Sequence, residues 1–170
     1  MVDIKQKLLS KIDLFYGTIS MPKGFEIDKD VLKKDILTQN IQDCPFPFSR
    51  DWDKLNTYLR EHINVEYGFS LINKLTTGLM FKPNESNLPE CENNTVDLRN
   101  SPDYVMLYGV DLENSNVKIY YDDNRRAGRS WDISLENNKF VMFPSTLIYH
   151  ISNNQKDKIN FILKTTYEYI

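Results

Sequence analysis

The chain has little of what several protein classes depend on. It contains one alanine, Ala127, which a largely helical protein would rarely show, because alanine is the strongest helix former. Its two cysteines, Cys44 and Cys91, lack metal-binding spacing, and we expect reduced thiols of a cytosolic protein. No apolar run approaches the roughly 18 residues of a membrane span. We also expect no signal peptide at the N-terminus.

An excess of charge of one sign is also lacking. The net charge is −3, with 21 basic and 24 acidic residues interspersed, so no basic surface for nucleic acid is expected. The densest basic group, Arg125 and Arg126 with Arg129, lies beside Asp122 and Asp123, which largely neutralise it. We therefore predict a soluble protein of the cytoplasm without nucleic-acid or membrane partners.

Aromatic residues, by contrast, are abundant, and they favour strands. The chain has 10 Tyr and 9 Phe. Two helices are predicted, one over 29–39 capped by Asp28 and one over 50–63 capped by Ser49. Helical spacing gives the second helix one apolar face, which consists of Trp52, Leu55, Leu59 and Ile63.

The rest of the chain alternates in the manner of β-strands joined by short polar turns. Strands are predicted over 14–20, 69–81, 103–112, 117–121, 129–135, 139–143, 146–151 and 158–169, and a polar loop over 83–101. This order predicts a mainly β (α+β) protein, a jelly roll with N-terminal helices packed on one sheet. We expect a single domain over 1–170, with an N-terminal strand and helical buttress over 1–67 and a jelly-roll core over 68–170.

The most informative motif lies near the C-terminus. Phe143-Pro144-Ser145 ends one strand, His150 lies in the next, and Lys158 opens the last. This stretch resembles the distal half of the double-stranded β-helix of 2-oxoglutarate/Fe(II) oxygenases, particularly the small phage-borne ones. In that family the distal His binds iron and a basic residue on the next strand binds the far carboxylate of 2-oxoglutarate. The resemblance gives these places to His150 and Lys158. Many Asn, Lys, Ile and Tyr residues, with AT-rich codons, fit a phage gene.

The chain departs from the family in the rest of the metal site. A non-haem Fe(II) oxygenase holds iron with two His and one carboxylate, and the family supplies the first two ligands as His-x-Asp or His-x-Glu on an early barrel strand. That motif is expected in or just before 100–112, yet neither His62 nor His150, the two histidines, begins one. The strongest metal site that can be assembled is His150 with Asp103, aided by Asp111 or a tyrosine. Such a site would bind Fe(II) weakly.

Each of these residues also has a plainer interpretation. His150 can be a core or rim histidine, and Lys158 an exposed lysine at a strand start. Arg126, Arg129 and Trp131 can form a partner-binding loop at the barrel mouth, because Trp and Arg are typical of binding hot spots. Alternatively, the arginines pair with neighbouring aspartates in a hairpin and Trp131 packs inward.

Three functions follow. The first is an oxygenase-like jelly-roll protein, encoded by a phage, that has lost the iron triad, holds no cofactor and acts as a binding or assembly protein. Its partner would be an unknown protein or an acidic small molecule. It could form a homo-oligomer, and it would be located in the host cytoplasm or in a virion. The alternative is an active 2-oxoglutarate/Fe(II)-dependent hydroxylase with a non-standard ligand set, using Fe(II) and 2-oxoglutarate. The third is a jelly-roll binder of a small ligand or carbohydrate. The sequence leaves open whether the protein is an enzyme.

Overall fold

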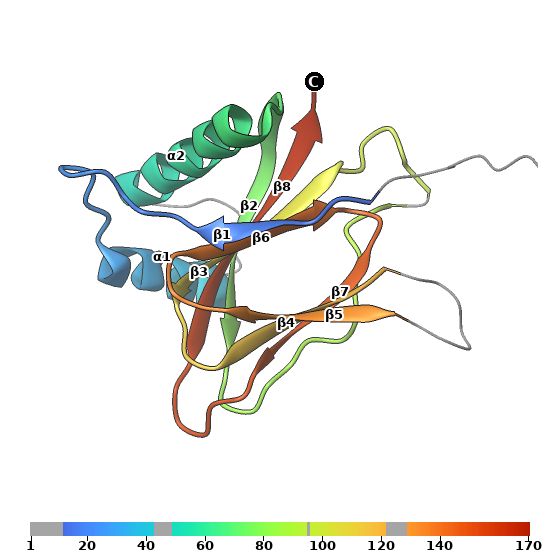
Figure 1. Ribbon diagram of the computed structural model, residues 1–170. Coiled ribbons are helices and arrows are strands. Elements are labelled where there is room, and N and C mark those ends of the chain that lie inside the picture. Colours follow the sequence, from blue (N-terminus) through green and yellow to red (C-terminus); the bar gives the residue numbers. More distant parts are fainter. Residues whose placement is uncertain (1–11, 43–48, 95, 122–128) are drawn as a thin grey trace, which may run out of the picture.

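Two antiparallel sheets face each other, and two helices cover the outer side of the larger one (Figure 1). The computed structural model describes residues 12–42, 49–94, 96–121 and 129–170. The helices are α1 (Lys29–Gln42) and α2 (Arg50–Tyr67). The strands are β1 (Phe15–Thr18), β2 (Leu71–Phe81), β3 (Tyr104–Asp111), β4 (Ser115–Tyr120), β5 (Ser130–Leu135), β6 (Lys139–Pro144), β7 (Ile148–Asn153) and β8 (Asn160–Tyr169).

The strand order explains how distant segments come together. The major sheet runs β1-β6-β3-β8-β2 and the minor sheet β5-β4-β7. Every pairing within these sheets is antiparallel. The mainly β architecture with helices on one sheet is therefore confirmed. The C-terminal strand β8 is not at the edge of the major sheet but lies between β3 and the edge strand β2 (Figure 1).

The predicted helix caps are present. The Asp28 carboxylate accepts a hydrogen bond from the backbone N–H of Asp30 at 2.9 Å, and Ser49 Oγ accepts one from that of Trp52 at 3.3 Å. Such bonds satisfy N–H groups that have no partner within the first helical turn. Gly68 ends α2 with φ 67°, a left-handed conformation that glycine adopts without a Cβ clash.

The major sheet is buried on both faces. On β6, Phe140 and Met142 belong to the core beneath the helices, whereas Val141 and Phe143 belong to the core between the sheets. All are at most 2% exposed. The apolar face of α2 closes the first core, because Trp52, Leu55, Leu59 and Ile63 are at most 1% exposed. A site between the sheets is thus separated from the helices by the major sheet.

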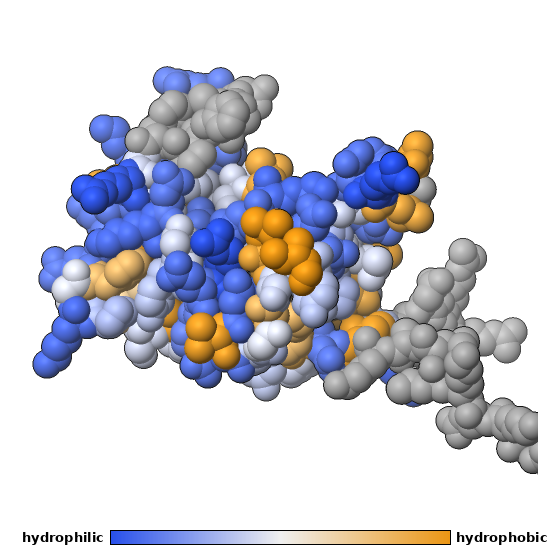
Figure 2. All heavy atoms as spheres, turned by 90° about the horizontal axis from the view of Figure 1, so that it is seen from above, coloured by the Kyte–Doolittle hydropathy of each residue, from blue (hydrophilic) through white to orange (hydrophobic). Residues whose placement is uncertain are grey.

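Large apolar side chains are exposed at several places on the surface, among them Ile41, Val65 and Leu88. Figure 2 shows the molecule from above, where hydrophilic residues cover most of the face and hydrophobic residues are exposed in small separate groups. Neither of the helices in the described ranges is long and apolar enough to cross a membrane.

Candidate functional site

Part of the predicted 83–101 loop runs beside β7 and extends the minor sheet. Ser86 forms an antiparallel bridge with Ser152, and Glu90 forms one with Tyr149. The backbone N–H groups of Glu90 and Tyr149 each donate to the other's carbonyl at 2.9 Å. Cross-strand partners on one face lie side by side, so this segment brings Glu90 directly beside Tyr149.

The alternation along β7 decides which side chains face the space between the sheets. Tyr149 and Ile151 are 0% exposed and belong to the core between the sheets. Ile148 is 47% exposed, and His150 is half-buried. Successive strand residues point to opposite faces. Tyr149 therefore takes the inward position, and His150 lies on the outer face of the minor sheet.

Four side chains meet beside Tyr149, and we call them the inner cluster: Glu90, Glu92, Tyr149 and Lys164. The Tyr149 hydroxyl donates to Glu90 Oε1 at 3.0 Å and to Glu92 Oε1 at 2.8 Å. Lys164 Nζ, from β8, donates to Glu92 Oε1 at 2.7 Å and lies 4.0 Å from Glu90 Oε1. The cluster thus holds two carboxylates, one ammonium and one phenol, drawn from β7, β8 and the 83–101 segment.

The electrostatics of the cluster keep Tyr149 neutral. Burial, and then the nearby carboxylates of Glu92 and Glu90, raise the pKa of Tyr149 far above its ordinary value. A phenolate here would be desolvated and placed against two negative charges. At neutral pH the hydroxyl is therefore a hydrogen-bond donor to the carboxylates.

Next to Lys164, the neighbouring strand carries a buried hydroxyl. Thr77 on β2 is directly opposite Lys164 in the register. Its Oγ1 is buried and makes no hydrogen bond within the described ranges. The Lys164 side chain is only 16% exposed. A partly buried ammonium beside a free hydroxyl can recognise a carboxylate if Glu92 moves aside.

The inner cluster does not fit the Fe(II) site that the resemblance implies. That site needs two imidazoles and one carboxylate, whereas the cluster offers two carboxylates and a neutral phenol. The Lys164 ammonium already lies 2.7 Å from Glu92 Oε1 and would oppose a divalent cation. Over the described parts of the chain, no three His, Cys, Asp or Glu residues are grouped as metal ligands.

The residues proposed from sequence as metal ligands, His150 and Asp103, have separate surroundings. His150 Nδ1 lies 3.2 Å from the Tyr120 hydroxyl on the outer face of the minor sheet. Asp103 Oδ2 accepts a hydrogen bond from the backbone N–H of Tyr169 at 2.7 Å, beside the major sheet. The structure does not bring the two together, because side chains alternate in direction along β7 and His150 points outward.

Lys158, the sequence candidate for 2-oxoglutarate binding, belongs to an ion-pair group at the end of β3. Its Nζ lies 3.2 Å from Asp111 Oδ1 and 3.8 Å from Glu113 Oε2. Lys33 Nζ from α1 lies 3.1 Å from Asp111 Oδ2. Burial alone would raise the pKa of Asp111, but the hydrogen bonds from Lys33 and Lys158 outweigh it and lower that pKa. Lys158 is not part of the inner cluster.

The candidate partner loop is described only at its two ends, since Arg126 lies outside the described residues. The backbone carbonyl of Arg129 accepts a hydrogen bond from the N–H of Tyr121 at 3.1 Å. Trp131 is 42% exposed and stacks edge-to-face on Tyr16, with centroids 5.3 Å apart and planes at 85°. Tyr16 lies on β1, so this pair joins edge strands of the two sheets.

Sequence reasoning missed every member of the inner cluster. One usable signal was that Leu147, Tyr149 and Ile151 occupy every second position. This alternation marks the inward face of β7 and excludes His150 from it. The other was the acid-x-acid pair of Glu90 and Glu92 within a segment otherwise read as loop.

No protein-family model matches the chain, and no curated protein sequence is similar to it. Solved structures are similar in fold. The α-ketoglutarate-dependent epimerase SnoN from nogalamycin biosynthesis has a TM-score of 0.65 and 8% identity over 91% of this chain and 76% of its own. The viral collagen prolyl hydroxylase from Paramecium bursaria Chlorella virus-1 has a TM-score of 0.62 and 13% identity over 91% and 96%.

A prolyl-4-hydroxylase from Pseudomonas putida is also similar in fold. Its TM-score is 0.61, at 11% identity over 91% of this chain and 87% of its own. At such identities the likeness shows the fold alone. The chain therefore has the double-stranded β-helix fold of 2-oxoglutarate/Fe(II) oxygenases, as the C-terminal motif implied.

Proposed function

We propose that this protein uses the oxygenase fold without the iron triad of that fold and acts as a binding or assembly protein. The observation that carries the proposal is that Tyr149, and not His150, is the residue of β7 that faces the space between the sheets. A metal site in that space would need a ligand from this position. Its neutral hydroxyl donates to both Glu90 and Glu92. A protonated phenol is a poor substitute for an imidazole as a ligand of Fe(II).

The charges of the inner cluster support binding rather than metal catalysis. Glu92 is paired with Lys164 at 2.7 Å, and its side chain is 21% exposed. A metal would have to displace this ammonium before both carboxylates became available. An acidic ligand would instead replace one carboxylate by another on Lys164, which conserves the charge pairing. An acidic small molecule, or an acidic side chain of a protein partner, is therefore the ligand class that we propose.

A second candidate is the active 2-oxoglutarate/Fe(II)-dependent hydroxylase with a non-standard ligand set. One observation favours it: oxygen donors of Glu90, Glu92 and Tyr149 converge beside a lysine. In that case the two carboxylates would hold Fe(II), and Lys164 would receive the far carboxylate of 2-oxoglutarate. The candidate ranks second because the donor set contains no imidazole.

Two measurements separate the candidates. In the first, protein reconstituted anaerobically with Fe(II) is given 2-oxoglutarate and O2, and succinate is quantified. We expect no succinate above the protein-free control. Turnover that needs the wild-type protein and is lost in Glu92→Gln would establish the enzyme instead.

The second measurement is a titration with glutarate, a dicarboxylate without a keto group, in the absence of metal. We expect binding that Lys164→Met weakens roughly tenfold, the usual loss for one charge-assisted hydrogen bond. Lys118→Met, which changes a partly exposed lysine on the outer face of the minor sheet, serves as the control. Equal affinity in all three proteins would remove the inner cluster as the binding site.

A further inference from the structure

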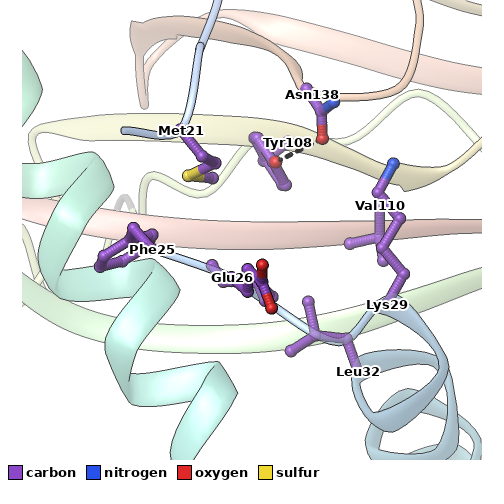
Figure 3. Close-up of a pocket in the computed structure, with 9 residues that line it drawn as sticks. Met21, Phe25, Glu26, Lys29, Leu32, Tyr108, Val110 and Asn138 are labelled. Atoms are coloured by element: carbon purple, nitrogen blue, oxygen red, sulfur yellow. Dashed lines mark hydrogen bonds between the residues drawn. The ribbon is translucent and has the colours of Figure 1, made fainter. Parts of the chain in front are cut away.

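A hollow lies on the face of the major sheet opposite the inner cluster. It is a cavity of about 240 Å³ between β3 and the chain that leads into α1 (Figure 3). Tyr108 and Val110 form its floor, and Met21, Phe25 and Leu32 supply apolar walls. Because a cavity of about 150 Å³ already admits benzene, this one has room for a single ring or branched chain with a short polar end.

One end of the cavity is built from a firmly held amide. The Asn138 backbone N–H donates to the Gly109 carbonyl at 2.9 Å, and its carbonyl accepts from the N–H of Ile19 at 2.8 Å. Asn138 Oδ1 accepts from the Tyr108 hydroxyl at 3.0 Å, as Figure 3 shows. These bonds fix the side chain, while its Nδ2 has no hydrogen-bond partner among the residues that the structure describes. The Asn138 side chain therefore stands at one end of a ligand-sized space, with its oxygen held by Tyr108.

Two opposite charges line the same cavity. Glu26 and Lys29 are three residues apart, yet within the described ranges their side chains form no ion pair with each other or with another residue. One turn further along, Asp30 and Lys33 do pair, at 2.7 Å. Both are exposed residues at the edge of the cavity, and Figure 3 shows the Lys29 side chain beside Val110.

We propose that this cavity binds a small zwitterion with an apolar side chain, in chemical terms a free α-amino acid such as phenylalanine or leucine. The ligand carboxylate would meet the Lys29 ammonium, and its ammonium would meet Glu26. The side chain would lie against Phe25 and Leu32. A neutral ring would pair with neither charge, and a simple anion would face the Glu26 carboxylate. The site is independent of the inner cluster and of the function proposed for it.

Calorimetric titration with L-phenylalanine tests the ligand class. The comparison compounds are 3-phenylpropionate, which lacks the ammonium, and 2-phenylethylamine, which lacks the carboxylate. We expect saturable binding of phenylalanine and roughly tenfold weaker binding of each comparison compound, since each loses one charge-assisted contact. Equal binding of all three would contradict a zwitterion site, and so would the absence of binding at millimolar phenylalanine.

Two variants test the location. Lys29→Gln and Glu26→Gln change exposed side chains, so both proteins should remain folded, and each should bind phenylalanine roughly tenfold more weakly. Lys34→Gln, on the same helix but outside the cavity, is the matched control and should bind as the wild type does. Amide shifts on binding should centre on Tyr108 and Asn138. Unchanged affinity in both test variants, or shifts centred elsewhere, would overturn the proposal.

Discussion

The hydroxyl of Tyr149 lies 2.8 Å from Oε1 of Glu92 and donates a hydrogen bond to it. This contact joins a fully buried residue of β7 to a segment that has no regular strand of its own. Burial and the carboxylates of Glu92 and Glu90 keep the phenol neutral, because a phenolate there would be desolvated and repelled. The chemistry of the inner face therefore depends on Tyr149 rather than on His150, its neighbour in sequence.

Replacing Tyr149 by Phe should destabilise the protein modestly. The ring stays in the core, but the hydroxyl bonds to Glu90 and Glu92 are lost, which corresponds to about 1–2 kcal/mol for buried hydrogen bonds. Urea unfolding measures the change. Tyr120→Phe, which removes a hydroxyl from the outer face, is the control and should have a smaller effect. An equal loss in both variants would show that the inner hydrogen bonds have no special weight.

Alkaline conditions should weaken the fold. Burial raises the pKa of Tyr108 to about 12, and burial with neighbouring carboxylates raises that of Tyr149 further. In the unfolded chain tyrosine loses its proton near pH 10. Above that pH the folded state binds more protons than the unfolded state, so the free energy of unfolding falls as pH rises. Unfolding followed from about pH 9 to about pH 11 should show this decline, and Tyr149→Phe should make it shallower. If the free energy of unfolding fell equally steeply with pH in the wild type and in Tyr149→Phe, the raised pKa of Tyr149 would be contradicted.

Asn153 should be far more important to stability than Asn154. The Asn153 side chain is buried, and its Nδ2 donates to the carbonyls of Phe81 and Lys82 at 3.0 Å and of Lys158 at 2.8 Å. Asn153→Ala would leave buried carbonyls without partners, and we expect a loss of about 2–3 kcal/mol. Asn154→Ala, at the exposed neighbouring position, should change stability by less than about 0.5 kcal/mol. Comparable losses in thermal unfolding would refute this role.

The fold could be predicted from sequence because its signals are local. Caps such as Asp28 and Ser49, the single apolar face of α2, and polar turns at short spacing each specify an element without reference to the rest of the chain. The predicted helices end early, at 39 and 63 rather than at Gln42 and Tyr67, because helix ends carry weak signals.

The site could not be predicted in the same way because it depends on long-range pairing. Glu90 meets Tyr149 only through a bridge between segments 59 residues apart. The segment that contains Glu90 is not a regular strand, so neither composition nor periodicity distinguishes it from a loop. The motif around His150 was recognised, but the resemblance alone did not establish which face of β7 that residue occupies. The alternation of buried residues along β7 settles that point.

The most direct test of the central claim is to rebuild the missing donors. Glu90→His together with Tyr149→His would place two imidazoles beside Glu92, in the His-x-Glu order of the oxygenases. We expect anaerobic Fe(II) titration to show no stoichiometric binding to the wild type and saturable binding to the double variant, with His150→Ala unchanged from the wild type. Stoichiometric Fe(II) binding by the wild-type protein, abolished by Glu92→Gln or by His150→Ala, would contradict the account.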